Sequence, residues 1–425
     1  MRTCILQPNL TQSSGQRDPE DALAEALSLV QALDVDVVDC FHVNLSKVNA
    51  GQYFGSGKVE ELKTTLKALE IDLVVLNGTL SPVQQRNLER SLKVKVLDRT
   101  ALILEIFGKR ARTKEGVLQV DLAHLTYQRS RLVRSWTHLE RQRGGGGFMG
   151  GPGETQIESD RRGIDNAIIR LKRQLEKVVK TRELHRKSRK KVPYPIVALV
   201  GYTNAGKSSI FNKLTGASVL EKDMVFATLD PTMRAIELPS GRRVILSDTV
   251  GFISDLPTQL VAAFRATLEE VLDADLLLHV RDIAHDETDF QSENVDLVLK
   301  ELGIPDEQFD DMIEVWNKSD LLDPETYQSR QHMAERNEKL ILTSAISDDG
   351  LAHLMARIEE ALSRDKQIET FDLKNEEGRL RAWLYEQNLV VSEEQHDDFG
   401  RLTLNWGDVD KQKFQALQKS NSRTN

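Results

Sequence analysis

One eight-residue segment constrains the fold of this 425-residue chain more than any other. It directly follows the apolar run Ile196–Val200, and a short, continuously apolar run is typical of a buried parallel strand. The segment matches the pattern GxxxxGK[ST] in full, in a strand–loop–helix context, and its residues are Gly201, Tyr202, Thr203, Asn204, Ala205, Gly206, Lys207 and Ser208. Backbone N–H groups of such a loop surround phosphate oxygens. The segment therefore predicts an α/β domain with a mostly parallel central sheet and a phosphate-binding loop at its edge.

Two side chains of this loop have expected roles in nucleotide binding. Lys207 should neutralise the β- and γ-phosphate oxygens, and the Ser208 hydroxyl should reach Mg²⁺. We expect a nucleoside triphosphate and Mg²⁺ as the cofactors of this domain.

The base is indicated by the tetrapeptide Asn317, Lys318, Ser319 and Asp320, about 110 residues further on and after a strand-like run. A carboxylate at Asp320 can accept hydrogen bonds from N1–H and the 2-amino group of guanine, a pair of donors that adenine lacks. The spacing therefore favours GTP and GDP over adenine nucleotides.

Two further segments complete the predicted site. After the strand-like run Val244–Ser247 come Asp248, expected to hold Mg²⁺ through water, then Thr249, Val250 and Gly251, whose amide should sense the γ-phosphate. Thr228 is the candidate for a hydroxyl that reaches Mg²⁺ only in the GTP state, within the segment Phe226, Ala227, Thr228, Leu229 and Asp230. A loop covering the guanine is expected at Ser344, Ala345 and Ile346. Lys207, Thr228 and Gly251 are the residues expected to act in hydrolysis.

Residues 1–110 predict a separate α/β domain with parallel pairing. Strands are expected at Val35–Val43, Ile71–Asn77 and Val94–Leu97, alternating with helices at Asp21–Leu33, Lys58–Leu69 and Pro82–Ser91. Gly55–Lys58 opens one of these helices. It is either a structural turn, which we favour, or a second anion-binding site.

Residues 111–191 predict an antiparallel helical hairpin. Apolar residues recur at heptad spacing in two stretches, Leu118–Leu139 and Ile164–Val178, on either side of the glycine-rich segment 144–153. No helix crosses such a segment intact, so it should form the tip of the hairpin. The tip is expected to contact a partner, and a disordered linker is the alternative. Residues 192–363 then form the nucleotide-binding domain and 364–425 a small α/β addition.

Charge is distributed very unevenly along the chain. Residues 128–191 carry 18 Lys or Arg against 7 Asp or Glu, a net charge of +11, whereas the whole chain has −9. An acidic protein with one strongly basic segment is expected to contact a polyanion there, and a solvated coiled-coil face is the alternative. Only two cysteines, Cys4 and Cys40, and no membrane span or secretory leader are recognisable, which favours a cytoplasmic protein. A monomer is expected, and the sequence leaves the oligomeric state open.

Together these motifs resemble the translation-factor-like GTPases, and nearly the whole chain resembles the HflX family. The most specific segments outside the nucleotide motifs are Tyr53–Lys58, Asp98–Thr100, Arg134–Arg141, Gly151–Gln156 and Phe226–Thr232. The resemblance implies binding to the large ribosomal subunit and its rRNA, and separation of stalled ribosomes into subunits. It also implies that the hairpin tip approaches the peptidyl-transferase region. Two departures from the family pattern stand out, because Met149 and Gly150 replace a basic tip and Arg281 interrupts an apolar strand end.

Other functions remain open at this point. An RNA-modifying or RNA-remodelling GTPase or ATPase that acts through its N-terminal domain is the alternative, although residues 1–160 hold no recognisable catalytic constellation. Phe252 stands where Ras-like proteins carry the glutamine that orients the attacking water. We therefore expect slow hydrolysis by the free protein and acceleration by the large subunit, unless Phe252 merely packs and another group positions the water.

Overall fold

The computed structural model describes residues 1–10, 17–135, 156–189, 194–217, 225–226, 228, 232–254, 270–363, 367–387, 389–396, 398–407, 410–411, 414–415 and 417–418. In the helical segments 114–135 and 156–189, side chains are described only for residues 114–132 and 158–181. The chain divides into two compact units. The first comprises Met1–Val179, Lys222–Asp230 and Asp255–Arg265, and the second Lys180–Glu221, Pro231–Ser254 and Ala266–Asn425. Each unit is described by itself.

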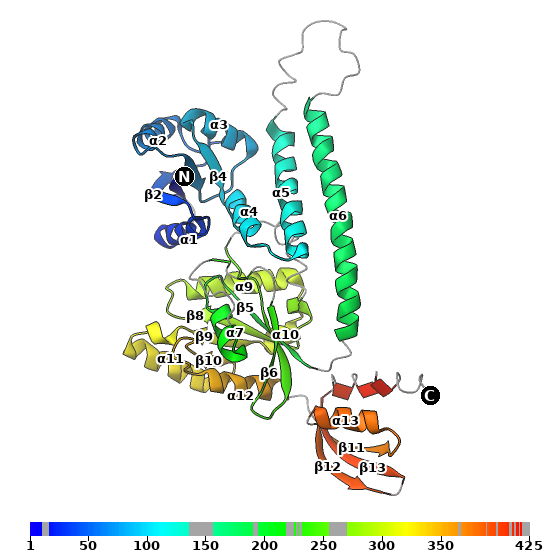
Figure 1. Ribbon diagram of the computed structural model, residues 1–425. Coiled ribbons are helices and arrows are strands. Elements are labelled where there is room, and N and C mark those ends of the chain that lie inside the picture. Colours follow the sequence, from blue (N-terminus) through cyan, green and yellow to red (C-terminus); the bar gives the residue numbers. More distant parts are fainter. Residues whose placement is uncertain are drawn as a thin grey trace. The chain divides into compact units, whose positions relative to one another are not determined.

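The first unit begins with a four-stranded, fully parallel sheet in the order β2-β1-β3-β4 (Figure 1). Its elements are β1 (Arg2–Leu10), α1 (Pro19–Gln31), β2 (Asp36–Leu45), α2 (Ser56–Ala68), β3 (Leu73–Leu76), α3 (Pro82–Leu92), β4 (Lys95–Asp98) and α4 (Arg99–Arg110). The predicted strands, helices and parallel pairing are confirmed. Strand β1, which is central to the sheet, and helix α4 were not predicted.

Local sequence explains where several of these helices begin. Ser81 and Gln84 form a capping box at the start of α3, which also has a proline in its first turn. Asp98 caps α4 by accepting from the Ala101 amide. Helix α2 begins at Ser56 after Gly55, and Lys58 pairs with the exposed Glu61 at 2.7 Å. A Cβ atom at Gly55 or Gly57 would meet nothing within 4 Å, so no close approach requires glycine there. The choice between a structural turn and a second anion-binding site stays open.

The predicted hairpin helices are α5 (Lys114–Ser135) and α6 (Gln156–Arg189), which run antiparallel and side by side (Figure 1). An ion pair joins them, between Arg129 Nη1 and Asp165 Oδ1 at 3.3 Å. Along α6, four of the predicted seam residues are half-buried and Ile168 is buried; the four are Ile164, Leu171, Leu175 and Val178. The glycine-rich tip at 144–153, with Met149 and Gly150, and the seam residues Trp136 and Leu139 lie outside the described residues.

The second unit contains a six-stranded sheet in the order β10-β9-β8-β5-β7-β6 (Figure 1). All neighbouring strands pair parallel except β6 with β7, which pair antiparallel. Its elements are β5 (Ile196–Gly201), α7 (Lys207–Thr215), β6 (Thr232–Glu237), β7 (Arg243–Asp248), β8 (Leu276–Asp282), α9 (Thr288–Leu302), α10 (Asp306–Asp310), β9 (Ile313–Asn317), the 3₁₀ turn η2 (Ser319–Leu321), α11 (Pro324–Arg336), β10 (Leu340–Leu342) and α12 (Leu351–Ala361). Helices α7 and α12 cover one face of the sheet with Ile210, Phe211, Leu354 and Ile358, all fully buried.

The same unit ends in a small antiparallel sheet, β11-β13-β12, formed by β11 (Gln367–Lys374), β12 (Val390–Gln395) and β13 (Phe399–Trp406). Helix α13 (Gly378–Glu386) and Phe414 pack on one face of it, around Leu402 and Leu404. This confirms the expected α/β addition at the end of the chain. Among the described residues, no helix has both the length and the apolar character needed to cross a bilayer.

Candidate nucleotide site

The predicted phosphate-binding loop lies between β5 and α7, and its conformation depends on two glycines. Gly201 has φ of +148°, and a Cβ atom there would lie 2.2 Å from the carbonyl oxygen of Val280 on β8. Gly206 has φ of +94°, and a Cβ there would lie 2.0 Å from Nδ2 of Asn317. Both positions therefore exclude any side chain, which leaves the backbone of the loop free to approach a ligand.

Lys207 is the buried cation of this loop. Its ammonium group donates to the carbonyl oxygens of Gly201, at 3.0 Å, and of Tyr202, at 2.6 Å, and the side chain is only 6% exposed. Burial lowers the pKa of Lys207 to about 8, against a smaller opposite effect of the Asp248 carboxylate. A buried ammonium with a lowered pKa is stabilised by an anion placed beside it, which fits the predicted contact with phosphate.

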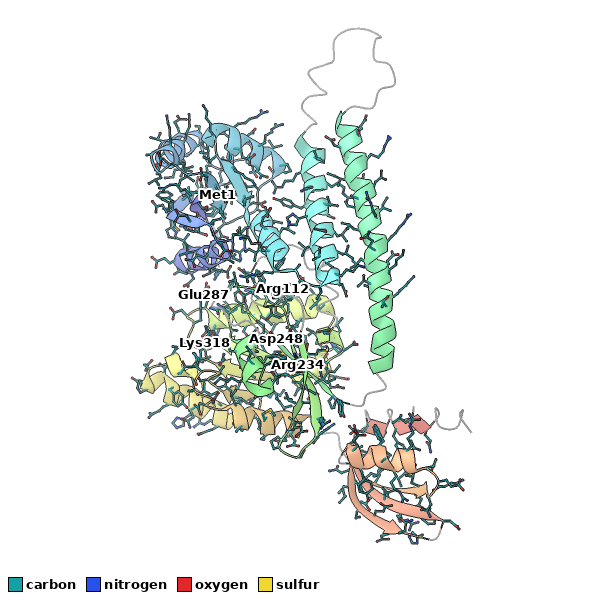
Figure 2. All side chains as sticks on the ribbon, viewed as in Figure 1. Met1, Arg112, Arg234, Asp248, Glu287 and Lys318 are labelled. Atoms are coloured by element: carbon teal, nitrogen blue, oxygen red, sulfur yellow. The ribbon has the colours of Figure 1, made fainter. Side chains whose placement is uncertain are left out.

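The predicted magnesium residues of the second unit meet at the end of β7. Asp248 is the last residue of that strand and is fully buried, and its Oδ2 accepts from the Ser208 hydroxyl at 2.7 Å. A carboxylate and a hydroxyl are hard oxygen donors of the kind that Mg²⁺ prefers. The donor set therefore fits a Mg²⁺ ion. Figure 2 labels Asp248, and also Lys318, which follows β9 of the same sheet.

Gly251 and Phe252 connect the end of β7 with the phosphate-binding loop. A Cβ at Gly251 would lie 2.9 Å from the Thr203 backbone and 3.1 Å from the Lys207 ammonium. The Phe252 amide donates to the Gly201 carbonyl at 3.1 Å, and the Phe252 carbonyl accepts from Thr203 at 2.7 Å. Phe252 itself is 1% exposed, which fits the packing alternative for this residue. Of its neighbours, Val250 is buried, and Thr249 donates to the Leu199 carbonyl at 2.5 Å.

The predicted guanine segment is bound directly to the phosphate-binding loop. Asn317 donates to the Ala205 carbonyl at 2.9 Å and accepts from the Ala345 amide at 3.1 Å. Asp320 is exposed, and its Oδ1 accepts from the Ser344 hydroxyl at 2.5 Å. The structure thus brings the two predicted base segments together, with Ser319, Ser344 and Ala345 buried and Ile346 77% exposed. Asp320 is exposed, so its carboxylate is not already buried and in need of a partner. It would distinguish guanine from adenine by the hydrogen bonds that the base donates to it.

Two residues of this region were not assigned a role from the sequence. Asp282, at the end of β8, pairs with the Lys318 ammonium at 2.6 Å and so holds a residue whose φ is +65°. The aspartate directly after an apolar strand was the available signal for it. Arg281, the departure noted above, forms ion pairs with Glu314 at 2.8 Å and Asp289 at 2.5 Å. Arg281 can therefore stand at the end of the apolar strand, because carboxylates on β9 and α9 neutralise its charge.

The remaining predicted segment is described only in part. Phe226 and Thr228 are buried, at 2% and 8% exposed, and both belong to the first unit. Ala227, Leu229 and Asp230 lie outside the described residues. The expected approach of Thr228 to Mg²⁺ therefore stays a prediction.

Known families match the chain in four consecutive segments. These are "GTP-binding GTPase N-terminal" over residues 20–108, "GTP-binding GTPase Middle Region" over 110–189, "50S ribosome-binding GTPase" over 196–318 and "HflX C-terminal domain" over 330–418.

Individual relatives match over most of their length. The chain is 49% identical to GTPase HflX of Magnetococcus marinus, covering 93% of this chain and 90% of the relative. It is 44% identical to GTPase HflX of Escherichia coli, covering 90% and 88%. Among solved structures, the crystal structure of SsGBP in complex with GDP is similar, with a TM-score of 0.50 and 26% identity over 85% of this chain and 98% of that one.

Proposed function

The chain belongs to the HflX family of GTPases, and we propose that it binds the large ribosomal subunit and separates stalled ribosomes into subunits, with GTP hydrolysis as the step that resets it. As a member of this family it is a P-loop GTPase that works with GTP, GDP and Mg²⁺. Its GTPase domain matches a ribosome-binding family. The splitting of ribosomes goes beyond these matches and is part of the proposal.

One observation carries the proposal: the phosphate-binding loop and the guanine segment form a single hydrogen-bonded unit. The bond from Asn317 to the Ala205 carbonyl joins them, within residues 196–318 that match the ribosome-binding GTPases. A site assembled in this way binds the base and the phosphates together. Nucleotide exchange and hydrolysis then change the whole site at once, as a conformational switch requires.

For the nucleotide site we propose the following roles. Lys207 and the loop amides hold the phosphates, Ser208, Thr228 and Asp248 serve Mg²⁺, and the Gly251 amide contacts the γ-phosphate. Asp320 accepts from guanine, while Asn317 and the loop of Ser344 and Ala345 position it. When bound, Mg²⁺ neutralises charge that develops on the phosphate oxygens during hydrolysis.

The basic hairpin is the proposed contact with ribosomal RNA. Several described basic side chains on α6 are exposed to solvent: Arg161, Arg162, Arg170, Lys172, Arg173, Lys177 and Lys180. Each Lys or Arg that neutralises an RNA phosphate releases a counterion, so such a surface binds RNA strongly and in a salt-dependent way. We propose that this surface, within residues 128–191, positions the glycine-rich tip on the subunit.

Sedimentation with purified ribosomes tests the proposal. The full-length protein with a non-hydrolysable GTP analogue should sediment with large subunits and convert intact ribosomes into separate subunits, and with GDP it should do neither. The variant Lys207→Ala should fail in both assays. Large-subunit binding without any splitting would overturn the splitting role and retain the ribosome-binding role.

A further inference from the structure

Phe226 is the most constrained described residue of the segment that contains Thr228. It is an aromatic residue with φ of +56°, a left-handed conformation that is unfavourable for bulky side chains. It is nevertheless almost completely buried, at 2% exposed, and the preceding Val225 is buried too. Packing interactions must therefore hold this short stretch in place.

The partner of Phe226 is Phe107, in the last turn of helix α4. The two rings meet edge to face, with centroids 4.5 Å apart and an interplanar angle of 73°. Phe107 is itself 1% exposed, so the contact lies within a packed core. Both residues belong to the first unit. The segment of Thr228 is thus anchored to the N-terminal domain.

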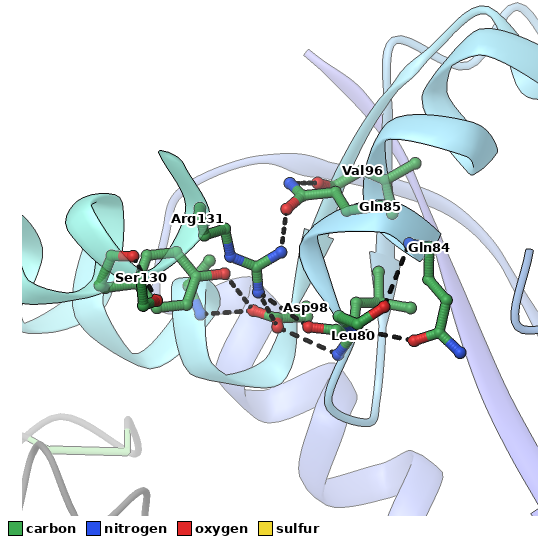
Figure 3. A network of polar contacts seen from close by, with 10 residues as sticks. Leu80, Gln84, Gln85, Val96, Asp98, Ser130 and Arg131 are labelled. Atoms are coloured by element: carbon green, nitrogen blue, oxygen red, sulfur yellow. Dashed lines mark hydrogen bonds and ion pairs between the residues drawn. The ribbon is translucent and has the colours of Figure 1, made fainter. Parts of the chain in front are cut away.

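The opposite end of α4 is tied to the hairpin by a buried polar network (Figure 3). Asp98, which caps α4 and is fully buried, accepts from the Tyr127 hydroxyl at 2.7 Å and from Arg131 Nη2 at 2.5 Å. Arg131 also donates to the Leu80 carbonyl at 3.2 Å and to the side chain of Gln85. Its guanidinium group lies 4.3 Å from the centroid of the Tyr127 ring.

This polar network joins α5 to the start of α4. The Asp98 carboxylate receives four hydrogen bonds in all, because the Leu80 and Ala101 amides donate to it as well. Burial and the neighbouring Asp98 charge raise the pKa of Tyr127, so its hydroxyl stays a donor at neutral pH. A buried carboxylate that accepts four hydrogen bonds from neighbouring elements favours a single arrangement of those elements.

We propose that helix α4 couples the nucleotide state to the hairpin: Phe107 positions the segment of Thr228 at one end, and Asp98 holds α5 at the other. Phe107 and Asp98 are positioning residues. Phe226, which was expected to be part of the nucleotide site, is 2% exposed and packs on Phe107, so in this proposal it too acts by positioning Thr228. The proposal depends on the GTPase activity and not on ribosome binding.

The direction of the effect follows from conformational entropy. The segment of Thr228 has to be ordered around the γ-phosphate in the GTP state, and GDP makes no such demand. An anchor two residues before Thr228 restricts the segment in advance and thereby favours GTP. Loss of the anchor should weaken GTP binding by roughly 5- to 30-fold, which corresponds to ordering about one residue, and should leave GDP binding almost unchanged.

The first test measures affinities of the free, full-length protein for GDP and for a non-hydrolysable GTP analogue, with Mg²⁺ present. Phe107→Ala should lower only the affinity for the GTP analogue, and Phe107→Leu should restore part of it. Phe226→Ala removes the same contact from the other side and leaves the α4 core intact. The double variant should show no further loss, since both changes remove one contact.

The matched control is Phe54→Ala, which also removes a fully buried aromatic ring from the N-terminal domain, in the core around Leu62 and Leu88. It should lower stability and leave the ratio of GTP to GDP affinity unchanged. Equal ratios in wild type, Phe107→Ala and Phe226→Ala, or an equal change in Phe54→Ala, would overturn the anchor.

The second test follows amide hydrogen exchange in α5. The GTP analogue should slow exchange around Arg131 in the wild type relative to GDP, and Phe107→Ala and Tyr127→Phe should each abolish this difference. Exchange in α5 that does not respond to the nucleotide in the wild type would contradict the coupling. Because no ribosome is present, this result is independent of the proposed splitting function.

Discussion

Lys207 illustrates how a single residue can oppose folding and serve binding. Its ammonium group is buried against two backbone carbonyls, and its pKa is lowered from 10.5 to about 8. Between these two pH values the unfolded chain binds a proton that the folded chain does not. The free energy of unfolding should therefore rise with pH across this window, and the burial penalty is fully present below pH 8.

The variant Lys207→Met tests this account. The nucleotide-free variant should lack the rise in unfolding free energy between about pH 8 and 10 that Lys207 gives the wild type, a contribution of roughly 1–3 kcal/mol. It should also bind neither GTP nor GDP measurably. Denaturant titrations at pH 7, 8.5 and 10 check the first outcome. Parallel pH profiles of variant and wild type would mean that the buried ammonium is not under strain.

Base recognition is the second prediction at this scale. Asp320→Asn replaces an acceptor that suits the two guanine donors with an amide, and GTP affinity should fall about 10- to 100-fold because one donor then loses its partner. ATP affinity should stay low. Competition binding with GTP, ATP and XTP measures the change. Retention of the full preference of the wild type for guanine would show that another residue selects the base.

The sequence was most informative for residues of this kind. Gly201, Gly206 and Lys207 were predicted because a phosphate loop needs these residue types at fixed spacing, and the structure places them together. The pairing of Lys318 with Asp282 was missed, because it joins residues 36 positions apart, one at the end of β8 and the other directly after β9. Pairwise contacts of that range depend on sheet order, which no local pattern specifies.

Among the elements, the periodic ones were predicted and the irregular ones were not. The heptad seam predicted α5 and α6 because its spacing repeats over many turns. Strand β1 was missed because Gln7, Pro8 and Asn9 interrupt its apolar pattern, although β1 lies between β2 and β3. Pro8 is accommodated near the end of the strand, and the buried Gln7 accepts from the Asn77 side chain at 2.6 Å.

The basic face of α6 carries the prediction at this scale. Reversing Arg170, Arg173 and Lys177 to Glu should weaken large-subunit binding and flatten its dependence on salt, because up to three phosphate contacts are lost. GTP affinity should be unchanged. The matched control reverses three exposed lysines elsewhere, Lys67, Lys93 and Lys95. An equal effect in the control would indicate general charge repulsion rather than a defined contact.

The division into units shows what the sequence could not reveal about the whole molecule. The motif order places the segment of Thr228 within the predicted nucleotide domain, since it lies between β5 and β7. The structure groups Lys222–Asp230 in the same compact unit as the N-terminal domain, where Phe226 packs on Phe107. A contact between residues more than a hundred positions apart leaves no trace in local composition.

The rate of GTP hydrolysis is the prediction that belongs to the whole protein. Phe252 is buried and cannot orient a water molecule, and positioning of the nucleophile is a large part of GTPase catalysis. The free protein should therefore hydrolyse GTP slowly, and purified large subunits should accelerate single-turnover hydrolysis by about 10²-fold or more. Small subunits alone serve as the control. Rapid hydrolysis by the free protein, with no response to large subunits, would refute this expectation.

The close approach of Asn317 to Gly206 also restricts which substitutions this protein can accept during evolution. Any side chain at 206 would collide with the amide that joins the two halves of the nucleotide site, since its Cβ would lie 2.0 Å from Nδ2. Shortening 317 would remove this collision but not the strain of φ +94° at 206, and it would give up the bonds of Asn317 to Ala205 and Ala345. A substitution at either position damages the site, so selection for nucleotide binding should remove both single variants. In a random mutant library selected for nucleotide binding, Gly206 and Asn317 should therefore both be retained.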